Sequence, residues 1–337
     1  MKQNYFLLLL KCALVAMPAG LLALAYWWFD PYKVVHPQGF DNYYNWQPFE
    51  LNRDFVSTQN FKAGQQSKPF DAFIFGSSRS FVYRTQVWEQ FLPAGSRAYH
   101  FDALSETLFG VSGKVKLILA SGAHPKNVLL ILDESLLKSI ANDKDVIHIK
   151  HPDVSGESRY AFQSVFLKSY FTDFFFKRYL QFRLTGNRDA FKGTAFQIKP
   201  NYFTTEGERN NFYYTGYDSL LHADSVGYYR EHADVFDVRK GKTQSDAVIG
   251  EAQQAMLHEI ASALQNENTR VEVIVNPLYD QIRMHPRDCA VLEQVFGAAH
   301  VHNFSGVNEY TSFMGNYYDP MHYKEPVAIS ILQKIYR

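Results

Sequence analysis

Cysteine is scarce in this sequence, with two residues among 337. Cys12 lies in an apolar N-terminal segment, and Cys289 stands alone in the rest of the chain. An intrachain disulfide in the part that follows the N-terminal segment is therefore excluded. An oxidising compartment permits disulfides without requiring them, and a chain of this length can depend on its own hydrophobic core.

A net charge is also lacking, because 34 Lys and Arg residues balance 34 Asp and Glu residues. Nucleic-acid-binding proteins normally carry a basic excess, so the balance argues against that class of partner. The sequence has no internal repeat and no low-complexity tract. Hydrophobic residues make up 46% of the chain, enough for a sizeable core in one large or two small domains. Aromatic residues, at 16%, suit both a core and a carbohydrate-facing surface.

The N-terminal segment is the longest hydrophobic run. Residues 12–29 are all apolar or aromatic residues, glycine and proline. About 20 such residues span the hydrocarbon core of a bilayer. The aromatic triplet at residues 26–28 matches an interfacial belt. We expect a transmembrane anchor over residues 1–29.

Two basic residues predict the orientation of this anchor. Lys2 and Lys11 lie on its N-terminal side, so we expect the N-terminus in the cytoplasm and the domain exported, in the periplasm or extracellular space. A cleaved signal peptide is the alternative, because residues 23–25 (Ala-Leu-Ala) have the small-x-small pattern. We favour an uncleaved, single-pass anchor in the inner or cytoplasmic membrane, since the aromatic belt continues directly through that point.

Beyond the anchor, strand patterns alternate with helical ones. We expect five strands, at residues 70–76, 97–101, 127–133, 270–276 and 300–304. We expect helices at residues 85–91, 107–120, 245–265, 286–296 and 325–336. The near-continuous apolar character of residues 127–133 is typical of a parallel strand buried on both faces. The alternation predicts an α/β fold, a three-layer doubly wound parallel sheet, over residues 69–337.

Two stretches interrupt the alternation. Residues 30–68 are rich in Asn, Gln, Tyr and Pro, and we expect a juxtamembrane connector there. Its aromatic residues could pack it on the domain: Tyr43, Tyr44, Trp46 and Phe49. Residues from about 140 to 243 lose their periodicity and are too many for an ordinary connection. We expect them to form an inserted cap over the carboxyl edge of the sheet, partly helical around residues 160–183.

The most informative stretch follows the first expected strand. Residues 70–75 (FDAFIF) suit a buried strand, which breaks at Gly76 and is followed by Ser77, Ser78 and Arg79. In an open α/β sheet, reactive groups lie where the chain leaves the carboxyl end of a strand. A serine there is a candidate nucleophile if a base lies nearby. The alternative is a turn serine that caps the next segment.

The candidate base is His322, near the end of the chain. Asp319, three residues earlier, can orient the imidazole while the imidazole takes the proton of the serine. Both residues lie between the last expected strand and the last expected helix, where a loop returns to the carboxyl edge of the sheet. The structural alternatives are a partly buried packing histidine and a turn-forming aspartate before Pro320.

Together these two blocks resemble the SGNH (GDSL-type) hydrolases and acyltransferases. In that family the nucleophile follows the first strand in a G-D-S-x block, and the Asp and His come from a late D-x-x-H block. Residues 76–79 match the first block with serine in place of aspartate, and residues 319–322 match the second. The G-[ST]-S-R form is common in the membrane-anchored envelope branch, which includes proteins similar to those that acylate teichoic acids or exopolysaccharides. The resemblance implies an SGNH or flavodoxin-like sheet, with Ser78 as nucleophile, His322 as base and Asp319 as its partner.

The resemblance also implies an oxyanion hole. The family builds it from the N–H of the nucleophile, a glycine N–H after the second strand and an asparagine after the third. Ser105 lies near the glycine position, and Ser135 follows the third strand in a block without asparagine. Losing one such donor typically costs about 10²–10³ in rate. Arg79 either binds an anionic group of the substrate or pairs with Asp133 or Glu134 as scaffold.

The residues and the resemblance predict serine-dependent acyl transfer on a cell-envelope polysaccharide or glycan. Water as acceptor gives an esterase, and a sugar hydroxyl gives an O-acyltransferase. A membrane protein that donates acyl groups is an expected partner, nucleic acid is not, and no metal or organic cofactor is implied. Two His-Ala-Asp triplets, at residues 222–224 and 232–234, lack the spacing of a known metal site, and we expect them on the surface. The alternative function is a catalytically silent anchored scaffold or glycan-binding component of an envelope assembly, which the missing asparagine favours.

Overall fold

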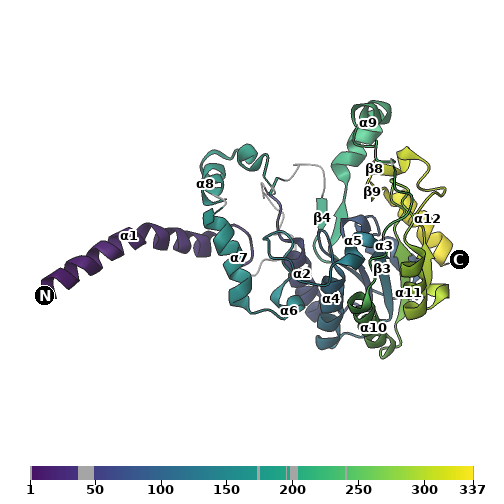
Figure 1. Ribbon diagram of the computed structural model, residues 1–337, viewed down its shortest axis with the longest axis horizontal. Helices are drawn as coiled ribbons and strands as arrows, with labels where there is room; N and C mark the ends of the chain where they lie inside the picture. Colours follow the sequence, from purple (N-terminus) through teal and green to yellow (C-terminus); the bar gives the residue numbers. More distant parts are fainter. Residues whose placement is uncertain are drawn as a thin grey trace.

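The computed structural model describes residues 2–36, 49–172, 175–194, 196–197, 204–239 and 241–336. A five-stranded sheet in the order β2–β1–β3–β6–β7 forms its centre (Figure 1). The strands are β1 (Ala72–Gly76), β2 (Ala98–Asp102), β3 (Asn127–Leu132), β6 (Arg270–Val275) and β7 (Val301–Asn303). Every pairing between them is parallel. The α/β class and the five strands expected from the sequence are confirmed.

The two central strands are apolar because both of their faces are covered. Every residue of β1 and β3 is buried, as is typical of a parallel sheet between helices. Ile74 of β1 pairs with His100 of β2 on one side and with Leu129 of β3 on the other. The strand order changes direction between β1 and β3. Ligands of open α/β sheets bind at the carboxyl ends of strands at such a point, so the end of β1 is a favourable place for a site.

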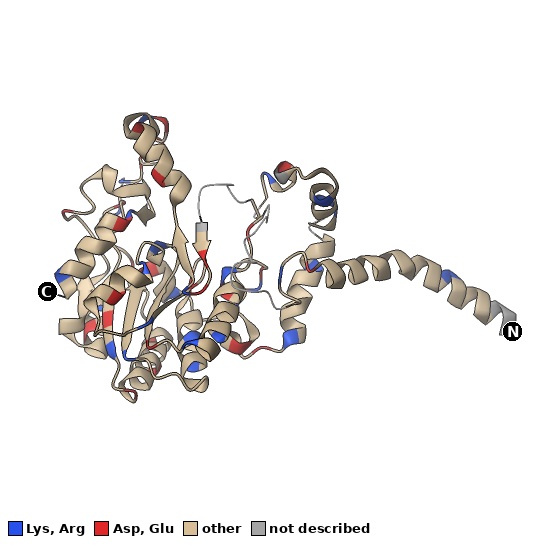
Figure 2. Ribbon diagram, turned by 180° about the vertical axis from the view of Figure 1, so that it is seen from behind, with Lys and Arg blue, Asp and Glu red and all other residues tan. Residues whose placement is uncertain are grey.

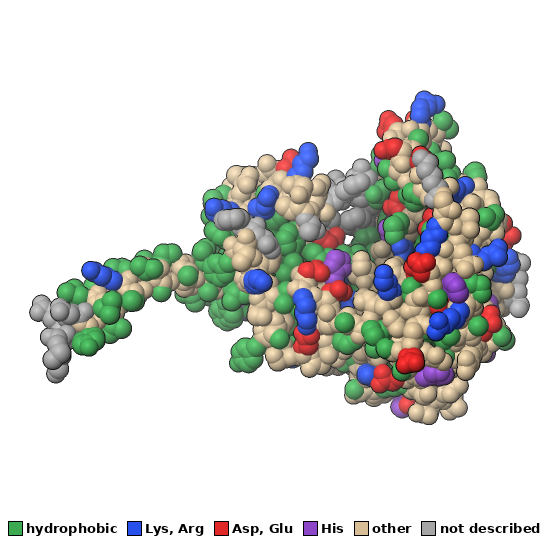
Figure 3. Space-filling view, in the orientation of Figure 1, with side chains coloured by type: hydrophobic (Ala, Val, Ile, Leu, Met, Phe, Trp, Pro, Cys, Tyr) green, Lys and Arg blue, Asp and Glu red, His purple; other side chains and the backbone are tan. Residues whose placement is uncertain are grey.

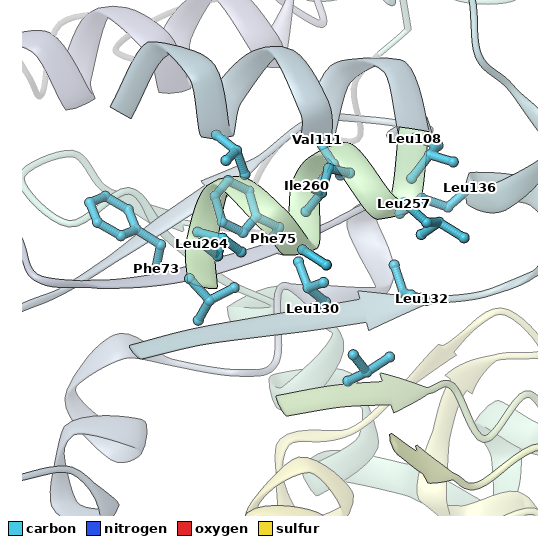
Figure 4. Close-up of a cluster of buried hydrophobic side chains, with 14 of the residues drawn as sticks. Phe73, Phe75, Leu108, Val111, Leu130, Leu132, Leu136, Leu257, Ile260 and Leu264 are labelled. Carbon is cyan, nitrogen blue, oxygen red and sulfur yellow. The ribbon is translucent and has the colours of Figure 1, made fainter. Parts of the chain in front are cut away.

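One face of the sheet packs against four helices. They are α2 (Arg53–Ser67), α4 (Leu108–Ala120), α10 (Glu251–Gln265) and α11 (Pro286–Phe296). Figure 4 shows part of this core, in which Phe75 and Leu130 of the sheet face Val111 of α4 and Ile260 of α10. All four side chains are at most 2% exposed, so this interface removes large apolar surfaces from water, the dominant favourable term in folding.

The opposite face packs against α3 (Thr85–Trp88) and the C-terminal helix α12 (Glu325–Ile335). Ile74 and Ile131 of the sheet share a second buried cluster with Trp88 and Ile331. A 3-10 turn, η3 (Glu89–Phe91), completes the helical stretch expected over residues 85–91. Helices therefore lie on both faces, which makes three layers.

Helix α10 begins six residues later than the sequence predicts. The expected helix started at residue 245, whereas α10 starts at Glu251, after Gly250 at its N-cap position. The carboxylate of Asp288 accepts the backbone N–H groups of Val248 (2.8 Å) and Ile249 (3.2 Å). These two bonds satisfy amides that a longer helix would have used, so the apolar residues before Gly250 pack without being helical.

The expected connector contains a buried helix that the sequence did not predict. Phe49 is fully buried, but the other three aromatic residues expected to pack this stretch, Tyr43, Tyr44 and Trp46, lie outside the described residues. Helix α2 starts after Asn52, whose side chain accepts the N–H of Phe55 at 2.7 Å. Its first residue, Arg53, is buried because its Nε donates to Asp102 of β2 at 2.8 Å. The polar composition of residues 53–67 suggested an exposed connector. The helix is nevertheless buried, because its polar side chains pair with residues far away in the sequence.

Between β3 and β6, the described residues add no strand to the central sheet. They form α5 (Glu134–Lys138), α6 (Pro152–Ser155), α7 (Arg159–Thr172), α8 (Phe175–Thr185), η4 (Arg188–Phe191), a hairpin of β4 (Thr204–Glu206) and β5 (Asn211–Tyr213), and α9 (Thr215–Glu231). The hairpin covers the edge of the sheet, where His100 N–H donates to the carbonyl of Arg209 at 3.0 Å. A separate aromatic cluster joins this segment to the start of α2, with the rings of Phe49 and Phe175 centred 5.0 Å apart.

The N-terminal helix α1 (Lys2–Phe29) projects from the domain (Figure 1). It is the one helix among the described residues that is long and apolar enough to cross a membrane, with a mean hydropathy of 2.2 over its most apolar window. Helix α7 lies at its C-terminal end, where Tyr26 donates to the side chain of Gln163 at 2.8 Å. The expected anchor therefore has the structure that spanning requires, and it is attached directly to the domain.

Candidate active site

Ser78 lies immediately beyond the carboxyl end of β1. The strand ends at Gly76, and Ser77 caps a 3-10 turn, η2 (Ser78–Ser80), by accepting the N–H of Arg79. A Cβ atom on Gly76 would come within 2.6 Å of the Cβ of Ser80, which is closer than real side chains approach. Glycine is therefore required here, because the chain turns back tightly over the end of the strand.

His322 and Asp319 come from a short hairpin near the end of the chain. Its strands are β8 (Tyr317–Asp319) and β9 (His322–Tyr323). One oxygen of the Asp319 carboxylate accepts the backbone N–H of Met321 at 2.8 Å and that of His322 at 3.1 Å. This local pattern is the turn that aspartate favours. It also holds the carboxylate beside the imidazole three residues later.

The fold brings the three predicted residues together. The Oγ atom of Ser78 lies 2.8 Å from Nε2 of His322. On the other side of the ring, Nδ1 lies 2.9 and 3.0 Å from the two carboxylate oxygens of Asp319. A hydroxyl, an imidazole and a carboxylate joined in this order can pass the serine proton to the ring while the carboxylate orients it.

Asp319 is held in its charged form. Burial alone would raise the pKa of its carboxyl group, but the hydrogen bond and charge of His322 and the two backbone N–H groups outweigh burial and lower the pKa below its ordinary value of 3.8. A carboxylate that stays ionised at neutral pH can stabilise an imidazolium ion when His322 takes up a proton.

Arg79 pairs with the scaffold. Its guanidinium lies 2.6 Å from the carboxylate of Asp133, at the end of β3, and donates to the hydroxyl of Ser135 at 2.8 Å. Ser135 in turn donates to Asp133. Burial would raise the pKa of Asp133, but Arg79 and the hydrogen bonds lower it. Of the two alternatives for Arg79, the structure shows the pairing with Asp133, and it joins Ser135 to the same buried group.

Ser105 lies in the turn after β2 and lines the same cavity as Ser78. Its φ angle is +45°, in the left-handed region that favours glycine. Within the part of the chain that the structure describes, neither the N–H of Ser78 nor that of Ser105 has a hydrogen-bond acceptor. Both residues line the cavity, and backbone N–H groups without a partner are the kind of donor from which an oxyanion hole is built.

The cavity beside Ser78 has a volume of about 1020 Å³. It is bounded by Leu104 and Ser105 after β2, by Glu50 before α2, and by side chains of α7 and α8. The surface is hollowed between α8 and α9 (Figure 3). Burial raises the pKa of Glu50 to about 7, against the opposing charge of Arg53. Glu50 is thus a group at the cavity that titrates near neutral pH, and no local pattern in the sequence pointed to it.

Tyr214 is a second residue at the site that the sequence did not indicate. It precedes α9, and its buried ring lies 6.0 Å from the ring of His322 and 4.7 Å from that of Tyr318. Its hydroxyl donates to the carbonyl of Ser78 at 3.4 Å. Burial raises the pKa of this phenol well above its ordinary value, with the charge of Asp319 adding to the effect. Tyr214 therefore acts as a neutral, apolar wall against the imidazole.

Comparison of the chain with protein-family models and with curated proteins gave no match. The interpretation of the site therefore depends on the geometry of its residues. A hydroxyl within hydrogen-bond reach of an oriented imidazole, beside unpaired N–H groups and a large cavity, can perform nucleophilic attack on a carbonyl carbon.

Proposed function

We propose that the protein is a membrane-anchored, SGNH-like serine enzyme that transfers acyl groups. The observation that carries the proposal is the 2.8 Å contact between Ser78 Oγ and His322 Nε2, with Asp319 on the far side of the ring. A serine hydroxyl is a weak nucleophile without a base at this distance. The place of Ser78 at the end of β1 supports the same interpretation, since reactive groups of open α/β sheets gather there.

In the proposed reaction, Ser78 Oγ attacks the carbonyl carbon of an ester while its proton moves to His322 Nε2. The ester C–O bond then breaks, and the leaving alcohol takes that proton from His322. Next, an acceptor hydroxyl gives its proton to His322 and attacks the acyl carbon. The bond to Ser78 Oγ breaks, and the proton returns to the serine. Asp319 keeps the ring in one orientation throughout and stays ionised.

The negative charge that develops on the carbonyl oxygen would be bound by the N–H groups of Ser78 and Ser105. The family uses a third donor, an asparagine, and in this chain Ser135 in that block is hydrogen-bonded to Arg79 and Asp133. A missing donor costs about 10²–10³ in rate. We therefore expect a slower enzyme than a member with all three donors.

We propose a cell-envelope polysaccharide or glycan as substrate, on the outer side of the membrane that α1 crosses. Water as acceptor makes the protein an esterase, and a sugar hydroxyl makes it an O-acyltransferase. Polar side chains in the largely apolar wall of the cavity support a hydroxyl-rich ligand, among them Ser164, Thr172 and Gln197. An acyl-donating membrane protein is the partner that the anchor suggests.

Labelling with a fluorophosphonate probe tests the proposal, because the probe reacts with activated serines. The full chain in detergent should be labelled at one peptide containing Ser78, and Ser78→Ala and His322→Ala should abolish the label. Ser77→Ala is the matched control and should keep it. A folded protein that is not labelled at all would support the alternative, a silent scaffold or glycan-binding component, which the incomplete oxyanion hole favours.

A further inference from the structure

The anchor helix is fixed to the domain by a hydrogen-bonded junction. Tyr26 at the end of α1 donates to Gln163 of α7 (2.8 Å), and Gln163 donates to the carbonyl of Val34 (2.7 Å). Tyr32 donates to the hydroxyl of Ser169, one and a half turns further along α7 (3.1 Å). One of these bonds joins α1 itself to α7, and the other two join α7 to the residues that directly follow α1, so the direction of α1 determines how α7 and α8 face the membrane.

Apolar side chains are exposed on both sides of this junction. On α8, Leu180 and Leu184 are 55% and 77% exposed, and they are one turn apart on the same side of the helix. Tyr160, at the start of α7, is 89% exposed. Arg183 of α8 lies over the ring of Phe29, with its guanidinium carbon 5.4 Å from the ring centre. Figure 3 shows hydrophobic side chains gathered where α1 meets the rest of the molecule.

All charged residues of the two helices α7 and α8 are Lys or Arg, although the whole chain has no net charge. Helices α7 and α8 contain five cations, Arg159, Lys168, Lys177, Arg178 and Arg183, and neither contains Asp or Glu (Figure 2). On α8, Lys177 and Arg183 lie on the same side of the helix as Leu180 and Leu184, and long basic side chains beside apolar ones can keep their charged ends at the headgroups of a bilayer while the leucines enter it. Basic residues near an anionic membrane surface are attracted to it.

We propose that an anionic phospholipid surface covers this face, which we call the α7–α8 face and define by Tyr160, Leu180, Arg183 and Leu184. The two leucines and the tyrosine enter the boundary between headgroups and acyl chains, and Lys177 and Arg183, exposed on the same helix, contact phosphate groups. Continuity with α1 supports the bilayer as the occupant, because the face begins where the apolar helix ends. This inference does not depend on acyl transfer.

The placement has a consequence for the cavity beside Ser78. Its wall includes Lys168 and Thr172 of α7 and Arg178 of α8. A helix with its side chains is about 10–12 Å thick. With α8 on the bilayer, this helical pair lies between the cavity and the lipid surface, so the proposal places the cavity near ligands that a lipid tail holds in the membrane.

The test measures lipid contact in the full chain. Leu184→Cys in a Cys12→Ser, Cys289→Ser background carries an environment-sensitive fluorophore, and the protein is placed in nanodiscs with one chain per disc. In discs that contain phosphatidylglycerol and brominated phosphatidylcholine, we expect a shift of the emission to shorter wavelength and several-fold stronger quenching than at the control site Val226→Cys. Val226, on α9, is 66% exposed, comparable with Leu184.

A pair of charge-reversal substitutions measures how much of the lipid contact depends on electrostatic attraction to the anionic lipids. Lys177→Glu with Arg183→Glu should remove most of the extra quenching in anionic discs, whereas Arg287→Glu, at an exposed residue of α11, should leave it unchanged. Equal quenching at residues 184 and 226 would overturn the proposal. So would an emission shift that requires two chains per disc and is not quenched by brominated lipid, since a second copy would then cover the face.

Discussion

The hydroxyl of Ser78 lies 2.8 Å from Nε2 of His322, although the two residues are 244 positions apart in the chain. One follows the first strand of the sheet, and the other lies in the hairpin that precedes the last helix. The ring of Tyr214 lies beside the imidazole, and Asp319 binds its far nitrogen. The contact is therefore held from three separate parts of the chain.

Ser78→Ala and His322→Ala should each reduce hydrolysis of a p-nitrophenyl ester to the uncatalysed background, with little loss of folded protein. The double variant should be no worse than either single one, because members of a triad act as a unit. Initial rates and a thermal unfolding curve for each variant measure this. Ser77→Ala should be mild. Activity that survives Ser78→Ala but disappears in Ser77→Ala would identify the other serine as the nucleophile.

Asp319→Asn should lower the rate of p-nitrophenyl ester hydrolysis by about 10⁴-fold. This reduction should be somewhat smaller than that caused by Ser78→Ala, because the substitution disturbs the orientation of the imidazole and leaves the nucleophilic oxygen in place.

The same substitution should change how stability depends on pH. The pKa of Asp319 is lowered in the folded state, so its contribution is present above its ordinary pKa and is lost as the pH falls through the lower folded value. The difference in unfolding temperature between wild type and Asp319→Asn should be constant from pH 7 to 5 and shrink below about pH 4. A difference independent of pH down to 2 would contradict the lowered pKa of the Asp319 carboxyl group.

The central strands of the sheet were predictable because they are buried on both faces, and continuous apolar runs such as residues 128–132 report that burial directly. Helix α2 was missed for the opposite reason. Its buried polar residues, Arg53 and Asp54, pair with Asp102 and Lys114, and nothing in the local sequence shows those partners. The predicted start of α10 at residue 245 was wrong because the carboxylate of Asp288, forty positions from Val248, binds the backbone there in a non-helical conformation, and the helix begins only at Glu251.

The residues of the site also fall into those that the sequence indicated and those that it did not. Ser78, Asp319 and His322 could be chosen from sequence because each lies in a short block with a fixed spacing. Glu50 and Tyr214 could not, since they reach the cavity from segments without a recognisable pattern and only the packing of the chain places them there. The partner of Arg79 was open between neighbouring acids, and geometry selects Asp133.

Lys114→Met should destabilise the protein by about 3–5 kcal/mol, because removing one member of a buried ion pair leaves an uncompensated charge. Lys114 is fully buried between Glu106 and Asp54. Burial would raise the pKa of Glu106, but Lys114 and Lys150 lower it to about 2. Chemical unfolding of the full chain measures the loss. The control is Lys116→Met on the same helix, an exposed pair with Glu259, which should cost less than about 1 kcal/mol.

The topology prediction concerns the whole chain. Lys2 and Lys11 lie in the N-terminal half of the apolar helix, before its long uncharged run, so Lys2 should stay in the cytoplasm and the domain from Asp30 onward should be outside it. A reporter that is active only outside the cytoplasm, fused after Arg337, should be active, and one that is active only inside should not. The reverse pattern would show the opposite orientation.

Substitutions of Ser105 test whether its backbone N–H or its side-chain hydroxyl donates the hydrogen bond to the oxyanion. If the donor is the N–H, both Ser105→Ala and Ser105→Gly should keep ester hydrolysis within a few-fold of wild type, since both retain that group. Ser105→Gly should also stabilise the protein by about 1 kcal/mol, because the left-handed conformation at φ +45° costs an L-residue about 1–2 kcal/mol and glycine little. Ser105→Ala should leave stability nearly unchanged, because alanine is an L-residue with the same strain. If instead both variants lose activity by about 10²-fold or more while staying folded, the hydroxyl of Ser105 is the donor, and the proposed pair of backbone N–H groups is wrong.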